Sequence, residues 1–162
     1  MAPQPLTPGG QPAGPPGLAV IGRKEHIDLP EWGLSRVRVK VDTGAYSSSL
    51  DVASFELSGE GAGLRARVWL ALDRRNPGRL TVVDAPVRGL VRVKSTSGEW
   101  QQRPLLETLM RLGPVTRPIR VTVCDRAGMR NRMLLGRQAL AGAFLVDVSR
   151  KYVLGRRKKR TS

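Results

Sequence analysis

Apolar and polar residues alternate in several short stretches of the chain. In Arg36–Val41 three valines alternate with three basic residues, and Leu64–Leu72 and Ile119–Cys124 show the same period of two. This period is typical of a β-strand with one buried face. By similar patterns, further strands or apolar runs are predicted at Leu18–Gly22, Leu80–Val83, Leu90–Lys94, Leu105–Leu112, Met133–Gly136 and Phe144–Val148.

Turn-forming residues separate these stretches. Pro30–Gly33, Asp73–Gly78, Ser95–Gly98 and the Gly113-Pro114 pair are rich in glycine, proline and small polar residues, which favour turns. Only Gln138–Leu140 suggests a short helical turn. Strands at short spacing without a long helical pattern predict an all-β fold, an antiparallel barrel or sandwich with one short helix near the C-terminus.

The two ends differ from the central part. Met1–Gly17 holds six prolines and four glycines and no charge, so we expect residues 1–17 to form a flexible arm. Residues 18–155 then form one domain, and residues 156–162 form a basic tail. The arm lacks the basic start and apolar run of a secretory signal, and the chain has no apolar stretch of about 20 residues that could span a membrane. A cytoplasmic protein is expected.

Charge is strongly positive. The chain has 28 Lys and Arg against 13 Asp and Glu, a formal net charge of +15, of which Arg156–Arg160 contributes five. A positive field attracts acidic peptides and nucleic acids. We therefore expect non-specific contact between the tail and polyanions.

Cofactor chemistry has little basis in the sequence. There is one cysteine, Cys124, and one histidine, His26, whereas a zinc site normally takes three or four nitrogen or sulfur ligands. The chain also lacks a glycine-rich loop that could hold phosphates. No metal and no cofactor are predicted.

The residues with the most informative chemistry follow the alternating strand at its end. Asp42-Thr43-Gly44-Ala45 has the Asp-Thr-Gly order of an aspartic peptidase loop. In such enzymes two adjacent carboxylates cannot both ionise, so one stays protonated while the other activates a water molecule. Asp42, Thr43 and Gly44 are therefore the candidate catalytic residues.

A second segment supports this interpretation. Met133–Gly136 runs into Arg137, and Phe144–Gly155 follows it. With Ile21–Arg23, Val41–Ala45, Ser47–Leu50, Asp125-Arg126 and Met129, these blocks resemble the retropepsin-like bacterial proteins that carry the name ATP-dependent zinc protease. The resemblance covers roughly Leu18 to Gly155.

The resemblance implies a retropepsin-like closed β-barrel and roles for several residues. Leu135, Gly136 and Arg137 would support the catalytic loop from behind. From its position the hairpin Ser95–Glu99 is either a flap, in which case Ser97 and Gly98 would bind substrate together with Ala45, or an ordinary exposed hairpin. In viral retropepsins an acid pairs with the arginine, but Tyr46 stands at that position here, so Arg137 requires another partner.

No second carboxylate within the chain matches the motif. Asp84, Asp125 and Asp147 all lack the following Thr/Ser-Gly. The dyad would therefore combine Asp42 of two protomers, which predicts a two-fold symmetric homodimer.

The resemblance further implies a link to ATP-grasp ligases that add amino acids, often glutamate, to peptides. The predicted function is hydrolysis of peptide bonds by an aspartic mechanism, in acidic or oligoglutamate chains. The alternative is a non-catalytic basic β-barrel module that binds nucleic acid or an acidic protein. A metal-dependent hydrolase, as the family's name would have it, is a third hypothesis.

Overall fold

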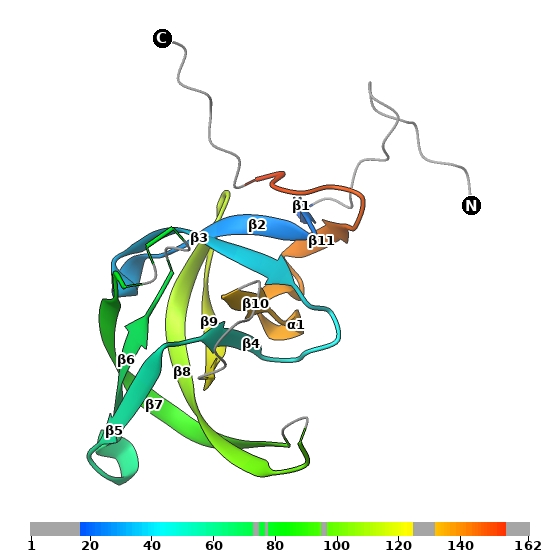
Figure 1. The fold of residues 1–162 in the computed structure, drawn as a ribbon. Helices are drawn as coiled ribbons and strands as arrows, with labels where there is room; N and C mark the ends of the chain where they lie inside the picture. The colour runs from blue at the N-terminus through cyan, green and yellow to red at the C-terminus, as the bar shows by residue number, and fades with distance from the viewer. Residues whose placement is uncertain (1–16, 73–74, 77, 95–96, 125–131, 155–162) are drawn as a thin grey trace, which may run out of the picture.

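The computed structural model describes residues 17–72, 75–76, 78–94, 97–124 and 132–154, and within them the chain is almost entirely β-structure (Figure 1). The prediction of an all-β fold with one short helix near the C-terminus is confirmed. The strands are β1 Ala19–Gly22, β2 Lys24–Leu29, β3 Leu34–Val41, β4 Ser48–Asp51, β5 Ser54–Ser58, β6 Arg65–Leu70, β7 Thr81–Lys94, β8 Trp100–Leu112, β9 Val115–Cys124, β10 Met133–Leu135 and β11 Phe144–Asp147. The helical elements are the 3₁₀ turns η1 Pro30–Trp32 and η2 Gly61–Gly63 and the α-helix α1 Arg137–Leu140.

Nine strands form one sheet, in the order β2-β3-β10-β4-β9-β8-β7-β6-β5. The sheet curves so that β2 also pairs with β8, at Asp28 and Arg111. β1 and β11 form a separate two-stranded sheet next to the strands of the main sheet (Figure 1). β10, β4 and α1 come together in this way although they are far apart in the sequence.

The expectation of a purely antiparallel sheet is wrong. β1 pairs with β11, β3 with β10 and β4 with β9 in parallel. The reason is that β10 returns from late in the chain and inserts between β3 and β4, so it runs parallel to one and antiparallel to the other. Alternation within a strand cannot reveal this, because it reports only which face of a strand is buried.

Two predicted strands are parts of one long strand. Of the predicted segments, 81–83 and 90–94 both fall in β7, which forms an extended hairpin with β8 (Figure 1). A register shift between Val87 and Gly89 lies between them. Such a shift changes which residues face the core, so the alternation breaks although the strand continues.

The core lies inside the curved sheet, where the predicted alternation is confirmed. Val37 and Val39 are at most 5% exposed, and Ala66, Val68 and Leu70 are at most 1% exposed. Other fully buried side chains are Ile21, Ile27, Leu29, Leu106, Met110, Ile119, Val121, Met133 and Leu135. Burial of these apolar side chains provides the main driving force for folding.

A buried carboxylate, Glu25, fastens the C-terminal segment to the sheet. Its Oε1 accepts hydrogen bonds from the backbone N–H groups of Gly22 (2.9 Å), Val153 (2.7 Å) and Leu154 (3.3 Å). The N–H of Tyr152 donates to the carbonyl oxygen of Lys24 at 2.8 Å. These bonds satisfy a polar group that would be costly to bury alone.

The domain limits remain predictions. Nearly all of the expected arm (1–17) and all of the basic tail (156–162) lie outside the described residues. Every helix in the described ranges is too short or too polar to cross a bilayer.

Candidate active site

Asp42 lies in a loop that leaves β3 beside β10. The backbone N–H of Asp42 donates to the carbonyl oxygen of Leu135 at 2.8 Å. The preceding residue, Val41, is the register partner of Leu135 in the parallel pair of β3 and β10. The end of the sheet ladder therefore fixes the backbone of Asp42.

The loop holds its own carboxylate. The N–H of Gly44 donates to Asp42 Oδ1 at 3.0 Å, and the N–H of Ala45 donates to the carbonyl oxygen of Asp42 at 3.3 Å. A Cβ added at Gly44 would lie 3.2 Å from Asp42 Oδ1, so glycine gives the carboxylate room. Asp42 is partly exposed, and Thr43 and Gly44 are exposed. The tight turn expected around the carboxylate is present, and it leaves Asp42 accessible.

Gly136 passes close behind this loop. A Cβ there would lie 2.5 Å from the carbonyl oxygen of Ser47 and 2.6 Å from that of Tyr46. These distances are shorter than any real contact, so only glycine fits. The N–H of Gly136 donates to Oγ of the buried Ser48 at 3.1 Å.

The first residues of α1 complete the contact. The N–H of Arg137 donates to the carbonyl oxygen of Ala45 (2.8 Å), and that of Gln138 donates to the carbonyl oxygen of Tyr46 (2.9 Å). The structure thus brings Leu135, Gly136 and Arg137 against the loop of Asp42.

Arg137 has a partner that the sequence did not reveal. Its Nη1 donates to the carbonyl oxygen of Thr43 at 3.0 Å. A backbone oxygen therefore accepts the bond for which viral retropepsins use an acid, and Tyr46 is 58% exposed. The side chain of Arg137 thus braces the Asp42 loop.

The hairpin residues Ser97 and Gly98 follow the end of β7. Both are exposed beyond the end of β7, where Gly98 turns the chain with a φ of +88°. On the same hairpin the guanidinium of Arg92 lies 5.0 Å from the ring centroid of Trp100, which is 60% exposed. Residues 95–96 of the expected flap lie outside the described residues. Substrate contacts by Ser97, Gly98 and Ala45 remain predictions.

The other acids considered have local partners. Asp84 Oδ1 accepts a bond from Arg65 Nε at 2.7 Å. Hydrogen bonds from the Oγ and N–H of Ser149 lower the pKa of Asp147. Asp125 lies outside the described residues. Across the described ranges, no group of three or more His, Cys, Asp or Glu side chains could hold a metal ion.

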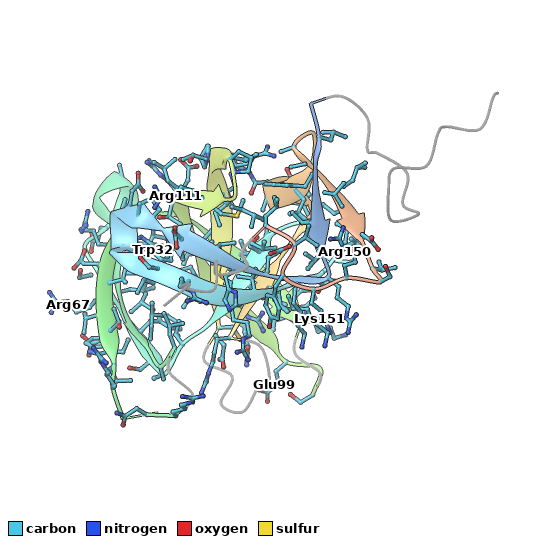
Figure 2. The ribbon with its side chains drawn as sticks, turned by 90° about the horizontal axis from the view of Figure 1, so that it is seen from above. Trp32, Arg67, Glu99, Arg111, Arg150 and Lys151 are labelled. Carbon is cyan, nitrogen blue, oxygen red and sulfur yellow. The ribbon has the colours of Figure 1, made fainter. Side chains whose placement is uncertain are left out.

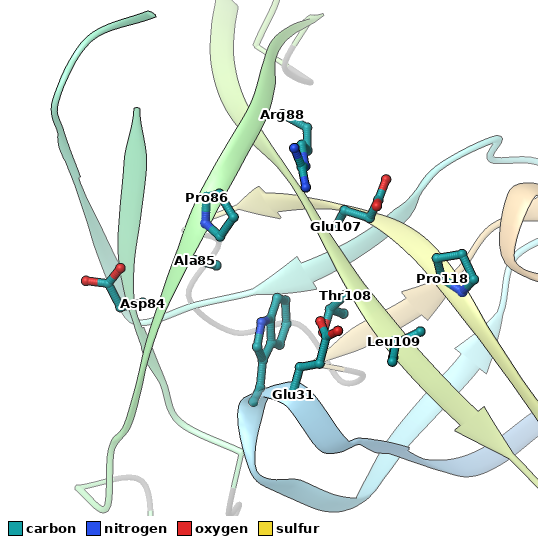
Figure 3. A pocket seen from close by; sticks show the side chains of 10 residues that line it. Glu31, Asp84, Ala85, Pro86, Arg88, Glu107, Thr108, Leu109 and Pro118 are labelled. Atoms are coloured by element: carbon teal, nitrogen blue, oxygen red, sulfur yellow. The ribbon is translucent and has the colours of Figure 1, made fainter. Parts of the chain in front are cut away.

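A separate pocket of ≈ 320 Å³ opens between β7, β8 and η1 (Figure 3). It is lined by Glu31, Asp84, Arg88, Glu107 and Thr108, among others, and does not include Asp42. Thr108 Oγ1 donates to Glu31 Oε2 at 3.4 Å across its floor. No sequence pattern indicated this pocket.

Comparison with curated proteins finds relatives with a ligase name. A protein named "Probable alpha-L-glutamate ligase" from Parasynechococcus marenigrum is 32% identical over 143 residues, covering 84% of this chain and 29% of the relative. A protein of the same name from Shewanella pealeana is 28% identical, covering 84% of this chain and 30% of the relative. The chain thus spans under a third of the length of these relatives.

A solved structure and a family profile agree on the fold. A Legionella pneumophila protein of unknown function has a TM-score of 0.70 at 23% identity, covering 84% of this chain and 98% of that protein. The profile of the RimB-like family, described as "Retropepsin-like aspartic endopeptidase RimB", matches residues 20–157. The chain therefore belongs to the RimB-like family of retropepsin-like aspartic endopeptidases.

Proposed function

We propose that the protein is an aspartic-type peptidase whose dyad combines Asp42 of two protomers. The observation that carries this proposal is the loop of Asp42. Its backbone is tied to Leu135, and one carboxylate oxygen accepts the N–H of Gly44 at 3.0 Å. The carboxylate is thereby oriented without being buried, as a group that must reach a substrate requires.

The chemistry needs two such carboxylates close together. Mutual repulsion keeps one protonated, and the dyad then titrates as a pair. The ionised carboxylate accepts a proton from a water molecule as that water attacks the peptide carbonyl carbon. The protonated carboxyl group donates to the carbonyl oxygen, and collapse of the tetrahedral intermediate transfers a proton to the leaving nitrogen.

A homodimer and a closed barrel belong to the proposal. Asp84 and Asp147, the alternative acids within the described residues, have their own partners, which supports a second Asp42 from a second copy. Barrel closure is supported by the pairing of β2 with β8, where Arg111 Nη2 lies 3.1 Å from Asp28 Oδ2.

The substrate proposed is an acidic peptide, and oligoglutamate in particular. The curated relatives are named for glutamate ligation. A hydrolase related to such a ligase would be suited to cleave the bond that the ligase forms. The net charge of +15 supports the same choice, because a positive protein attracts an anionic chain. A functional link to an ATP-grasp ligase is part of this proposal.

Cleavage of a peptide panel tests the proposed function. We expect the protein to cleave oligoglutamate faster than oligoglutamine of equal length, and to do so equally with and without a chelator, because the proposed dyad needs no metal. The products are measured by mass spectrometry. Loss of cleavage on chelation would instead support a metal-dependent hydrolase, and cleavage of neither peptide by the folded dimer would contradict the proposal.

A second candidate function, polyanion binding, is favoured by one cluster of positive charge. The basic patch comprises Lys24, Arg23, Arg38, Lys40 and Lys151. The pKa of Lys24 is lowered by desolvation and then by the charges of the other four residues. A lowered lysine pKa means that the positive form is disfavoured in the folded protein, and a bound anion would relieve this repulsion.

Replacing Lys24 by glutamine tests this second function. If the basic patch binds a DNA duplex, the slope of log affinity against log salt should fall by about one. Arg67→Gln is the matched control, because Arg67 and Lys151 lie on opposite sides of the molecule (Figure 2). Affinities are measured by fluorescence anisotropy. Equal effects of the two substitutions would show that binding depends on net charge and not on the basic patch.

A further inference from the structure

Arg103 on β8 is a buried cation with unused donors. Only 9% of the residue is exposed. Its Nε and Nη2 atoms are buried and have no hydrogen-bond partner within the described part of the chain. Burying a charge without a partner is costly. The unpaired guanidinium therefore lowers the stability of the fold, and a bound anion would offset this cost.

The two unpartnered atoms define the shape of that ligand. Nε–H and Nη2–H lie on the same edge of the planar guanidinium and point in the same direction. Two parallel donors of this kind match the two oxygens of a carboxylate in a bidentate pair. The edge of Arg103 is therefore a site for a planar, bidentate anion.

A pocket of ≈ 300 Å³ lies beside Arg103. Arg103 lines it together with Phe55, Gln101, Gln102, Val123 and Cys124. The glutamine amides add polar groups, and Phe55 supplies an apolar wall. The pocket is therefore suited to a side chain with an apolar stem and a carboxylate head.

An acid on β4, Asp51, forms an ion pair with another arginine. Asp51 is the register partner of Cys124, which lines the pocket. Its Oδ2 lies 3.2 Å from Nη1 of Arg132. Among the described residues, no group hydrogen-bonds the Nε and Nη2 donors of Arg103.

We propose that the Arg103 pocket binds a carboxylate side chain of an acidic peptide, at a site separate from the Asp42 loop. The pocket lies between β5, β8 and β9, and its β8 residues follow the turn that carries Ser97 and Gly98. A peptide held there would be anchored at a distance from the scissile bond. The identity of the ligand rests on the proposed function, whereas the anion site itself rests on Arg103.

Binding to full-length protein carrying Asp42→Asn tests the proposal without cleavage. We expect a capped hexaglutamate peptide to lose about tenfold in affinity on Arg103→Met, because a charge-assisted bidentate pair is lost. Arg103→Lys should lose nearly as much, since lysine keeps the charge but not the fork. Affinities are measured by calorimetry at constant ionic strength, and thermal melts verify folding.

Arg120→Met is the matched control, because Arg120 is exposed on β9 and its loss changes the net charge equally. It should change the affinity less than twofold. Equal losses for Arg103→Met and Arg120→Met would overturn the proposal, as would unchanged binding by Arg103→Met. Inorganic phosphate that binds in an Arg103-dependent manner, while hexaglutamate does not, would overturn the assignment to a peptide.

Kinetics with Asp42 intact separate this inference from the proposed function. If both hold, Arg103→Met raises KM for hexaglutamate while kcat changes little, because the pocket lies apart from the reacting atoms. Absence of cleavage with an Arg103-dependent affinity overturns the proposed function alone. Cleavage with an unchanged KM overturns the Arg103 site alone.

Discussion

Replacing Asp42 by asparagine is expected to abolish peptide cleavage while the protein remains folded and dimeric. Asparagine keeps an oxygen that can accept the N–H of Gly44, now 3.0 Å from Asp42 Oδ1, so the loop keeps its shape. It removes the charge that activates water and the shared proton of the dyad. We expect a rate loss of at least ~10³-fold, the scale of general acid–base catalysis. Initial rates on oligoglutamate measure it.

Asp84→Asn is the matched control for this substitution. Asp84 lies on β7, outside the Asp42 loop, and its Oδ1 accepts a hydrogen bond from Arg65 Nε at 2.7 Å. Its replacement should therefore leave the cleavage rate within about twofold. Surface ion pairs contribute little to stability, so this variant should also fold. Full activity of Asp42→Asn, or equal losses for both variants, would contradict an Asp42 dyad.

Mixing the two forms tests whether the dyad is shared between chains. Because each active site would need Asp42 from both protomers, activity should follow the square of the wild-type fraction once subunits exchange. An equal mixture would then retain about a quarter of the activity of an all-wild-type sample. Activity proportional to the wild-type fraction would place the whole active site within one chain.

The parts of the fold that were predicted correctly are those with local signals. In β3 and β6 the alternating residues Val37, Val39, Ala66, Val68 and Leu70 are buried as expected. Gly136 and the short helix after it follow an apolar run, and the helix stands where the sequence pattern suggested a helical turn. A period of two and a turn-forming residue each depend on neighbours in the sequence, which a single chain displays.

β2 was missed because its alternation includes a charged residue at a core position. Its buried residues are Glu25, Ile27 and Leu29. Glu25 is tolerated there because backbone N–H groups of residues 22, 153 and 154 donate to it. Two of these donors lie more than 120 residues away, so no local pattern could show that the carboxylate would be satisfied.

The sequence indicated which segments meet at the Asp42 loop, but not the bonds between them. The motif identified Asp42, and the resemblance placed Leu135–Arg137 behind it. The acceptor for Arg137, the carbonyl oxygen of Thr43, is a backbone atom and has no sequence signature. Arg103 was one of many arginines in the sequence, and its burial depends on how β8 and β9 are positioned. Sequence patterns give residue types, whereas tertiary structure decides which charges lack partners.

Gly136→Ala is expected to lower both the stability and the activity of the protein, because the added methyl group clashes with the backbone of the Asp42 loop. The added Cβ would lie 2.5 Å from the carbonyl oxygen of Ser47 and 2.6 Å from that of Tyr46. Relief requires moving α1 away from the loop, which breaks the bonds from Arg137 N–H to Ala45 and from Gln138 N–H to Tyr46. We expect a loss of about 3 kcal/mol in the free energy of unfolding, the scale of overpacking with lost hydrogen bonds.

Gly63→Ala is the matched control, because a Cβ there meets no atom within 4 Å and its backbone does not require glycine. It should change the free energy of unfolding by less than ~1 kcal/mol. For Gly136→Ala, a fall in Tm of roughly 6–12 °C is expected by thermal denaturation. The protein that remains folded should still cleave poorly, because the Asp42 loop rests on this glycine. A Gly136→Ala protein as stable and active as Gly63→Ala would show that α1 can shift freely, and would remove this segment from the support of the active site.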